Sequence, residues 1–512
     1  MARLARGIVV PDSARQRMAA SRDWVLRAAG GELGDADMPV YGVNTGYGSL
    51  ARVRIDGADI ERLSMNLVRS HAAGVGAAVP PDVTRAMMLL RANALAKGAS
   101  GCAPVLVDTL VSMLAAGVVP EVPCQGSCGS SGDLAPLAHL GLVVFRAADG
   151  STDATGRAWF GGELMSGEAA MAAAGIERVV PGPKDGLAMT NGAQLSTAYA
   201  VLAAEDARAL VLAAEVAAAM SFEALRGVSR ALHPAVHALR PYPGAVACAA
   251  NLRRLLTGST LVDSIPDKVQ DAYALRCTPQ VVGAARDGIA FAVRQVGVEV
   301  NAATDNPLIL VDVDADNKAF SAGLFHGEPV GMAADHLKLA VAEIGALSER
   351  RSYRLTTGTL SARLPPLLVQ RDRPGIGLMA PQTTAAALVS ENRALCWPAS
   401  ADSIPTCEDQ EDHVAMSTTA ARRAADVVAN VRNIVAIEVL CAATALWWRM
   451  RKEGAVPCPA VAAALGVVEG ALDGRGTGCP ADDIARIEPL VAGELADVVM
   501  ASAGPLQEVP LG

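Results

Sequence analysis

The sequence predicts a mostly α-helical protein, because of its composition and the spacing of its apolar residues. Of its 512 residues, 51% are hydrophobic but only 3% are aromatic, so alanine, leucine and valine supply the apolar content. These residues favour long, closely packed helices over strands. Two runs repeat apolar residues every three or four positions: Leu337, Val341, Ile344 and Leu347, then Val427, Val431, Ile434 and Ile437. We expect both runs to be helices of a bundle.

The chain is long enough to form two or more lobes. Residues 1–190 are punctuated by glycine and proline, with short helical pieces such as residues 84–97 between them. This pattern predicts a loop-rich N-terminal lobe. Residues 191–512 hold the longer periodic runs and are predicted to form a long-helix bundle and a C-terminal region.

Charge and composition exclude several classes of partner. A net charge of -9 and the lack of clustered lysine and arginine argue against nucleic acid. The apolar run at residues 201–220 is interrupted by charged side chains, so no membrane span is expected. Ten scattered cysteines indicate reduced thiols in a cytoplasmic protein. A mean hydropathy of +0.29 favours an oligomer with apolar surface between its subunits.

Residues 126–139 form a Gly/Ser-rich loop that runs directly into an apolar, helix-like segment. Glycine at 132 permits a strained backbone in which its nitrogen approaches the carbonyl carbon of Ser130. Cyclisation and loss of two waters, one from the side chain of Ser131, would leave a five-membered ring with an exocyclic methylidene. Such a ring is an electrophile. The alternative is an ordinary loop before a helix.

Other segments also combine polar side chains with flexible backbone. Residues 41–48 hold two tyrosines among glycines, as a structural turn also would. His71 lies among small residues, where a structural histidine is the plain alternative. Gln270, Tyr273 and Arg276 are three positions apart, which a solvated helix face would also show. Metal chemistry is not expected: His233 and His237 are four positions apart, but there is no His-Glu-x-x-His motif and Pro234 interrupts the local pattern.

Seven segments between Tyr41 and Met416 resemble, in the same order, motifs of the histidine and aromatic amino-acid ammonia-lyase family. The triad Ser130-Ser131-Gly132 is similar to the Ala-Ser-Gly of that family, with serine in place of alanine. The other six begin at residues 41, 70, 191, 270, 325 and 410, and read Tyr-Gly-Val-Asn-Thr-Gly-Tyr-Gly, Ser-His-Ala-Ala-Gly, Asn-Gly-Ala-Gln, Gln-Asp-Ala-Tyr-Ala-Leu-Arg-Cys-Thr-Pro-Gln, Phe-His-Gly-Glu-Pro and Gln-Glu-Asp-His-Val-Ala-Met.

The resemblance implies a fold, a cofactor and an assembly. The fold would be an elongated helical bundle of the ammonia-lyase and fumarase-aspartase type. The cofactor would be methylidene-imidazolone (MIO), formed autocatalytically from Ser130, Ser131 and Gly132, without a metal or an external cofactor. The assembly would be a homotetramer that acts on a small amino acid, with active sites built from several subunits.

Catalytic roles follow from the same resemblance. Tyr41 would remove a β-proton from the substrate as a general base. Tyr273, with Gln270, would complete the polar wall near the MIO group and the substrate amine. Glu411 would face the side chain of the substrate.

Binding roles follow as well. Arg276 would pair with the substrate carboxylate, with Asn191 beside it. Phe325 would pack against the reacting group. His71 and Glu411 would contact an imidazole, and both residues favour L-histidine as the substrate and trans-urocanate as the product.

Four positions depart from the family pattern or are unusual beside it: Ser130, Thr190, Leu324 and Trp397. They leave a second hypothesis open, in which the same cofactor serves a lyase or 2,3-aminomutase acting on another aromatic or imidazole amino acid. A third hypothesis is an inactive helical scaffold of the same fold.

Overall fold

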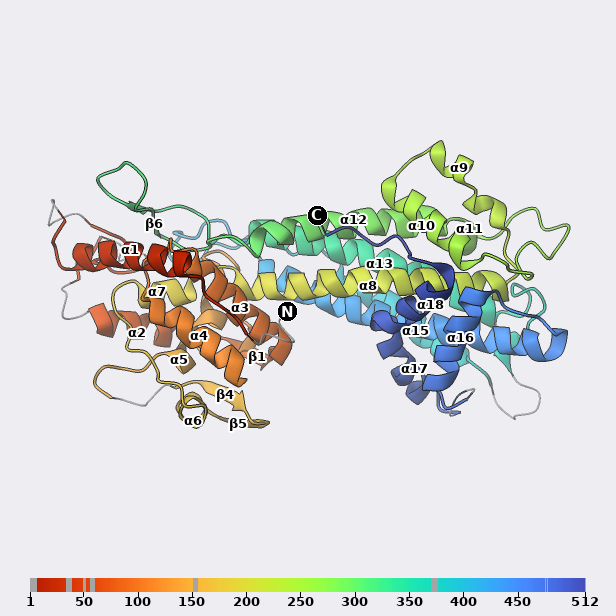
Figure 1. Cartoon of the computed structure of the whole chain (residues 1–512), viewed down its shortest axis with the longest axis horizontal. Coiled ribbons are helices and arrows are strands. Elements are labelled where there is room, and N and C mark those ends of the chain that lie inside the picture. Colours follow the sequence, from red (N-terminus) through yellow and green to blue (C-terminus); the bar gives the residue numbers. More distant parts are fainter. Residues whose placement is uncertain are drawn as a thin grey trace. The chain divides into compact units, whose positions relative to one another are not determined.

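A computed structural model describes residues 7–33, 39–48, 52–55, 60–150, 155–369, 376–474, 476 and 478–511. Most of the described residues are helical, so the predicted fold class is confirmed (Figure 1). The chain divides into two compact units. Unit 1 comprises Met1–Leu202, Gln295–Ala334 and Pro398–Arg422, and unit 2 comprises Ala203–Arg294, Asp335–Trp397 and Arg423–Gly512.

Unit 1 combines short helices with small antiparallel sheets. Its short helices are α1 (Asp12–Ala29), α2 (Ile60–His71), α3 (Pro81–Ala96), α4 (Pro104–Ala116), α5 (Leu134–Val144), α6 (Gly167–Ala173) and α7 (Asp185–Thr190). Its strands are β1 (Val75–Ala78), β2 (Val119–Pro120), β3 (Pro123–Gln125), β4 (Arg157–Phe160), β5 (Glu163–Ser166), β6 (Leu308–Ile309) and β7 (Ala319–Phe320). The sheet orders are β1-β3, β2-β4-β5 and β6-β7.

Four long helices each begin in one unit and end in the other. They are α8 (Gln194–Ala224), α12 (Thr278–Glu299), α13 (Glu328–Thr356) and α15 (Ser417–Glu453). The apolar residues whose spacing predicted helices lie in α13 and α15, and all of them are buried. Alanine fills much of the buried surface of α8, which combines high helix propensity with close approach of neighbouring helices.

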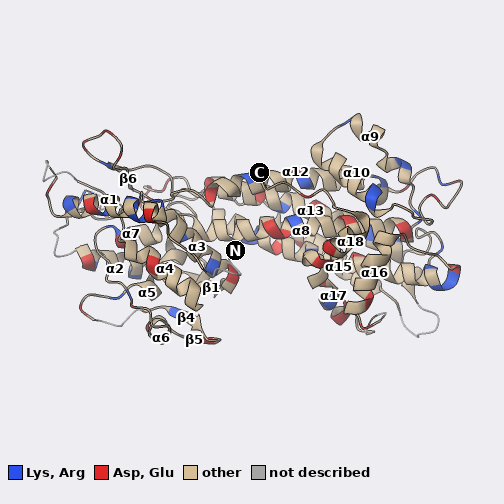
Figure 2. Ribbon diagram, in the orientation of Figure 1, with Lys and Arg blue, Asp and Glu red and all other residues tan. Residues whose placement is uncertain are grey.

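Unit 2 adds shorter helices to its parts of the long ones. The α-helices are α9 (Pro234–Ala238), α10 (Pro243–Leu255), α11 (Tyr273–Arg276), α14 (Met379–Leu395), α16 (Pro459–Ala471), α17 (Pro480–Pro489) and α18 (Leu495–Ala503). The other helical turns are η4 (Ser229–Leu232), η5 (Pro366–Leu368) and η6 (Leu490–Glu494). Basic and acidic residues are interspersed along the helices of both units (Figure 2).

Sequence signals account for several helix ends. Proline opens α3, α4, α10 and α16, where its fixed φ suits the first turn and its missing N–H is not needed. Gly117 ends α4 with a φ of +82°, a left-handed conformation that glycine adopts without strain. The Ser166 side chain caps α6 by accepting a hydrogen bond from the Ala169 amide.

Helix α15 is long and apolar enough to cross a membrane by length and composition. However, 72% of its apolar window is buried inside the protein. Packing against protein therefore accounts for its apolar character.

Candidate functional site

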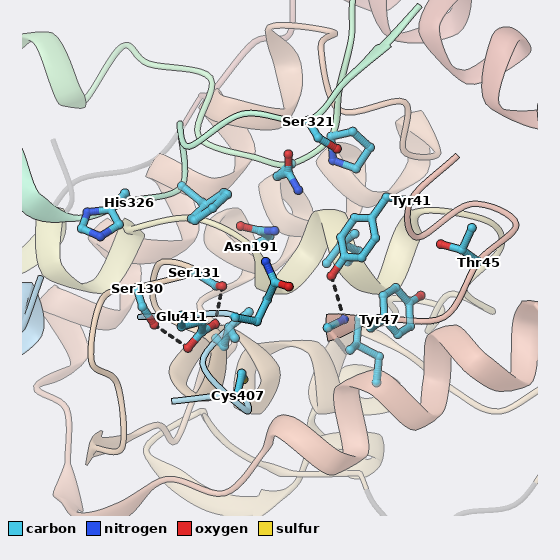
Figure 3. Close-up of a pocket in the computed structure, with 18 of the residues that line it drawn as sticks. Tyr41, Thr45, Tyr47, Ser130, Ser131, Asn191, Ser321, His326, Cys407 and Glu411 are labelled. Atoms are coloured by element: carbon cyan, nitrogen blue, oxygen red, sulfur yellow. Dashed lines mark hydrogen bonds between the residues drawn. The ribbon is translucent and has the colours of Figure 1, made fainter. Parts of the chain in front are cut away.

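A cavity of about 830 Å³ lies in unit 1. Segments far apart in sequence line it, and Figure 3 shows side chains from several of them pointing into the same space. The structure brings together these predicted site residues at its wall: Tyr41, His71, Ser130, Ser131, Asn191, Phe325 and Glu411. Gly132 follows Ser131 in the loop and is buried.

The Gly/Ser-rich loop is packed so tightly that two of its positions accept no side chain. Gly132 has a φ of +74°, and a Cβ added there would lie 2.2 Å from the carbonyl carbon of Gly192. Gly129 has a φ of +72°, and its Cβ would lie 2.1 Å from Ser417 Oγ. The loop is therefore compressed against its neighbours in a conformation that requires glycine.

Asp133 anchors the end of this loop from a fully buried position. Its carboxylate accepts hydrogen bonds from the hydroxyls of Ser127 at 2.8 Å, Ser196 at 2.9 Å and Thr418 at 2.5 Å. The Ser196 amide adds a fourth at 2.8 Å. The Asp133 amide donates to the Gly192 carbonyl oxygen at 2.8 Å. This network holds the triad against helix α8 and the start of helix α15.

Glu411 receives three hydroxyl groups on its carboxylate. Ser131 donates to Oε1 at 2.5 Å and Ser130 donates to Oε2 at 2.8 Å (Figure 3). Thr406 also donates to Oε2, at 2.6 Å. Burial opposes the charge of this group, but the hydroxyl donors outweigh burial and lower the pKa of Glu411. The side chain is therefore an ionised hydrogen-bond acceptor at the cavity wall.

A strained turn presents Glu411. Thr406 and Glu411 face each other as a two-residue antiparallel bridge, with backbone hydrogen bonds of 3.0 and 3.3 Å. Between them, Cys407, Glu408 and Asp409 have φ values of +51°, +54° and +62°. Left-handed conformations cost non-glycine residues about 1–2 kcal/mol each. Strain of this kind concentrates at functional sites.

Tyr41 lies in a loop that its glycines allow to bend. Gly42 has a φ of +68°, and a Cβ there would lie 2.5 Å from Leu187 Cδ2. The Tyr41 hydroxyl accepts a hydrogen bond from the Gly48 amide at 3.0 Å. Burial raises the pKa of Tyr41, and the nearby charge of Glu411 adds to this rise. In the isolated chain the phenol therefore keeps its proton near neutral pH.

His71 and Asn191 contribute polar side chains to the cavity wall. His71 Nδ1 lies 2.8 Å from the Leu67 carbonyl oxygen, so we place the ring proton on Nδ1 and the acceptor lone pair on Nε2. Asn191 is buried, and its Oδ1 atom has no hydrogen-bond partner among the described residues. An unpaired buried oxygen at a cavity wall indicates a site for a ligand donor.

Phe325 is half-buried at the cavity wall, next to a pair of stacked histidines. The rings of His326 and His413 lie 5.7 Å apart and nearly parallel. His326 Nδ1 accepts from the Glu328 amide, so its Nε2 donates to the His413 carbonyl oxygen at 3.2 Å. These contacts fix the segment that carries Phe325.

Gln270, Tyr273 and Arg276 do not line this cavity and belong to unit 2. Helix α11 is a single turn that begins at Tyr273, so Gln270 precedes it and the helical spacing holds only from Tyr273 to Arg276. Tyr273 is 69% exposed, and the Arg276 guanidinium lies 4.8 Å from the centre of its ring. Arg276 Nε is buried without a hydrogen-bond partner among the described residues.

Three residues singled out as unusual have identifiable environments. The Thr190 hydroxyl donates to the Gly186 carbonyl oxygen at 3.1 Å, within α7, so this group serves the helix backbone. Leu324 is 49% exposed beside Phe325. Trp397 is 75% exposed in unit 2, where its carbonyl oxygen accepts from Lys338.

Sequence reasoning missed three residues that support the site. Thr406 and Asp133 hold Glu411 and the triad through the hydrogen bonds described above. Arg91 is fully buried, and it donates to the Asn191 carbonyl oxygen at 2.8 Å and to Gln194 at 2.9 Å. Asp133 could have been found from its position between the triad and a helix start, whereas Thr406 and Arg91 carry no local signal.

Comparisons with known proteins agree over most of the chain. The model of the aromatic amino acid lyase family matches residues 1–469. A histidine ammonia-lyase of Anaeromyxobacter sp. (strain K) is 50% identical over 446 residues, 86% of each chain. The crystal structure of histidine ammonia-lyase from Trypanosoma cruzi has a TM-score of 0.86 and 36% identity, covering 96% of this chain and 90% of that one. Tyrosine aminomutase from Streptomyces globisporus has a TM-score of 0.89 and 32% identity, covering 99% and 97%.

Proposed function

The chain belongs to the aromatic amino acid lyase family, and from that premise we propose that it eliminates ammonia from L-histidine to give trans-urocanate. The observation that carries the proposal is the pairing of an ionised Glu411 with His71 at the wall of one cavity. A carboxylate and an imidazole ring nitrogen with a lone pair can each accept a hydrogen bond from a substrate ring N–H. The histidine ammonia-lyases at 42–50% identity support the same substrate.

The proposal includes an MIO group formed from Ser130, Ser131 and Gly132. The loop fits this group, since Gly132 lies in a compressed conformation against Gly192 where any side chain would clash. The Ser131 hydroxyl, which maturation would eliminate as water, points to Glu411. When present, MIO supplies the electrophile that an unactivated amino acid needs before ammonia can leave.

The side chains of this chain would then bind the substrate and move its protons. Tyr41 takes the β-proton as general base. Because burial raises the pKa of Tyr41, this role requires a cation close to the phenol when the site is complete. Asn191 Oδ1 is free to accept a hydrogen bond from the substrate. Phe325 covers the reacting end and excludes water.

We further propose that the active protein is a homotetramer with shared sites. Gln270, Tyr273 and Arg276 would enter the cavity of a neighbouring subunit. There Arg276 would bind the substrate carboxylate and supply the cation that Tyr41 needs. The 69% exposure of Tyr273 supports this role.

The ten free cysteines support a cytoplasmic location, where thiols stay reduced.

The test is incubation of the purified full-length protein with L-histidine while the ultraviolet absorbance of urocanate is followed. L-Phenylalanine and L-tyrosine, assayed in parallel, are the controls for substrate class. We expect turnover of L-histidine, with intact mass showing a chain lighter by two waters. A chain that has lost both waters but gives no urocanate at high enzyme concentration contradicts the proposed substrate.

A second candidate is a 2,3-aminomutase, which the likeness to tyrosine aminomutase motivates. Chromatography of the products separates the two candidates, because a mutase returns the amine to the β-carbon and accumulates a β-amino acid. An inactive scaffold is the third candidate. An unmodified intact mass would favour it.

A further inference from the structure

Maturation would change the surroundings of Glu411 unequally. Its Oε1 atom accepts from Ser131, whereas its Oε2 atom accepts from Ser130 and Thr406. Loss of the Ser131 oxygen as water removes the hydroxyl donor from Oε1. The two donors on Oε2 remain, because Ser130 would contribute its carbonyl carbon to the ring and keep its side chain.

The position of Ser130 suits a permanent role. The residue is only 6% exposed, and the distance from its Oγ to Glu411 Oε2 is 2.8 Å. Serine stands here in place of the alanine of the motif that the triad resembles. A methyl group could not donate a hydrogen bond, so the hydroxyl adds a contact to Glu411 that alanine would lack.

We propose that Ser130 is a positioning residue for substrate recognition: its hydroxyl, with that of Thr406, holds Glu411 Oε2 so that Oε1 faces the substrate imidazole N–H after maturation. This inference rests on the proposed function and deepens it. These two hydrogen bonds restrict rotation of the Glu411 carboxylate before the substrate binds. Substrate binding therefore costs less side-chain conformational entropy. The same two hydrogen bonds also favour the charged form, because both hydroxyls donate to it.

Other groups near Glu411 bear on its protonation. Burial raises the pKa of Tyr41, Cys128 and Cys407, and the Glu411 charge adds to each rise. His71 lines the same cavity. The Cys407 thiol also hydrogen-bonds the Glu411 carboxylate and contributes to its lowered pKa, but after the hydroxyl donors. The loss of the Ser130 donor should therefore still raise the pKa of Glu411 and shift the acid limb of the pH profile.

The first experiment compares Ser130→Ala and Ser130→Thr with the wild type, using L-histidine as the probe. In a matured Ser130→Ala protein we expect KM to rise about tenfold, the magnitude of losing one hydrogen bond to a charged group. The acid limb of kcat/KM should move to higher pH, because Glu411 loses a donor. Threonine keeps the hydroxyl and should restore both values. Wild-type KM and an unmoved acid limb in Ser130→Ala would overturn the proposal.

A matched control is Ser229→Ala in unit 2. The Ser229 hydroxyl also donates to a carboxylate, that of Asp263, at 2.5 Å, but outside the site. This variant should keep the wild-type KM and pH profile. An equal change in both variants would show a general effect of losing a serine-carboxylate contact, and would overturn the specific role of Ser130.

Intact mass establishes whether Ser130→Ala still loses two waters. If it does not, Thr406→Val tests the same oxygen from outside the loop. The proposal then predicts a raised KM for L-histidine in matured Thr406→Val, and an unchanged KM would overturn it.

A crystal structure of the matured wild type separates this inference from the proposed function. Ser130 Oγ within about 3 Å of Glu411 Oε2, with Oε1 open to the cavity, supports the inference. A Ser130 hydroxyl turned away from Glu411 overturns it. Absence of L-histidine turnover in the same matured protein would instead contradict the proposed function.

Discussion

Around the cavity of unit 1, the carboxylates of Asp133 and Glu411 are held by serine and threonine hydroxyls. In the helices of unit 2, Glu215 and Glu438 each form a salt bridge with a buried arginine, in addition to neutral donors from Asn251 and Ser221 respectively. Arg351 contacts both oxygens of Glu438 at 2.5 and 2.7 Å, with both side chains fully buried.

The difference separates two uses of a buried carboxylate. A guanidinium neutralises its partner and occupies both oxygens, so Glu438 is closed to further chemistry. Hydroxyls stabilise the charge without cancelling it. In the described residues no cation forms a salt bridge with Asp133 or Glu411, so the site keeps negative charge that can orient a loop or receive a substrate donor.

The largest expected effect is a loss of activity when the triad at the cavity of unit 1 is changed. Ser131→Ala removes the oxygen that maturation eliminates, so the chain should not lose two waters. Activity should fall by roughly 10³-fold or more, since covalent activation is lost. Thermal unfolding should change little, because the matured wild type would also lack the Ser131 hydroxyl that contacts Glu411 in the unmodified chain. Intact mass measures the loss of waters, and the urocanate assay measures the activity. A Ser131→Ala chain that is still lighter by two waters would show that the triad is misassigned.

The second-largest expected effect is a loss of unfolding free energy when a buried ion pair in the helices of unit 2 is broken. Arg351→Met leaves Glu438 buried and without its guanidinium, which costs about 3–5 kcal/mol of unfolding free energy. Denaturant unfolding at fixed protein concentration measures this loss. Intact mass should still show a matured loop in the folded protein.

The double variant Arg351→Met with Glu438→Leu is the control for that experiment. Replacing a buried pair by apolar side chains is often neutral, so most of the stability should return. If the single and double variants are equally unstable, the lost unfolding free energy comes from packing and not from the unpaired charge of Glu438. The proposed difference between the carboxylates of the two units would then be wrong.

The smallest expected effect concerns pH. In the unmodified chain, burial opposes the charge of Glu411, but the hydroxyls of Ser131, Thr406 and Ser130 outweigh it and lower the pKa of Glu411 below its ordinary value of 4.5. The donors from Thr406 and Ser130 would remain after maturation. A group with a lowered folded pKa stabilises the fold above its unfolded pKa, and this contribution is lost as pH falls through the folded pKa. The stability difference between wild type and Glu411→Gln should therefore be present at pH 7 and shrink as the pH falls below the ordinary value of 4.5. A difference that grows toward acid pH would contradict the assigned charge.

Much of the fold could be predicted because its signals are local. The low aromatic content favours closely packed helices. The three- and four-residue spacing along α13 and α15 follows from the geometry of a helix. The short strands could not be predicted, because two- to four-residue pairings such as β6-β7 depend on neighbours distant in sequence.

The sequence indicated which residues meet at the cavity only where a motif is continuous. The triad, Tyr41 and Glu411 stand in such motifs, and they line one cavity or lie beside it. Thr406 and Arg91 were missed because their roles depend on single contacts with residues that the chain brings near from other segments. Arg276 also stands in a continuous motif, but the motif did not reveal that this residue belongs to unit 2. That assignment depends on where the long helices carry the chain from one unit to the other.

Those long helices have a consequence for synthesis. Because α8, α12, α13 and α15 each pass between the units, neither unit is an uninterrupted stretch of chain. A ribosome makes residues 126–133 long before it makes Thr406, Glu411 and Thr418, which complete the contacts of that loop. The proposed self-modification would therefore have to wait until most of the protein has emerged from the exit tunnel, so we expect truncated translation products to remain unmodified.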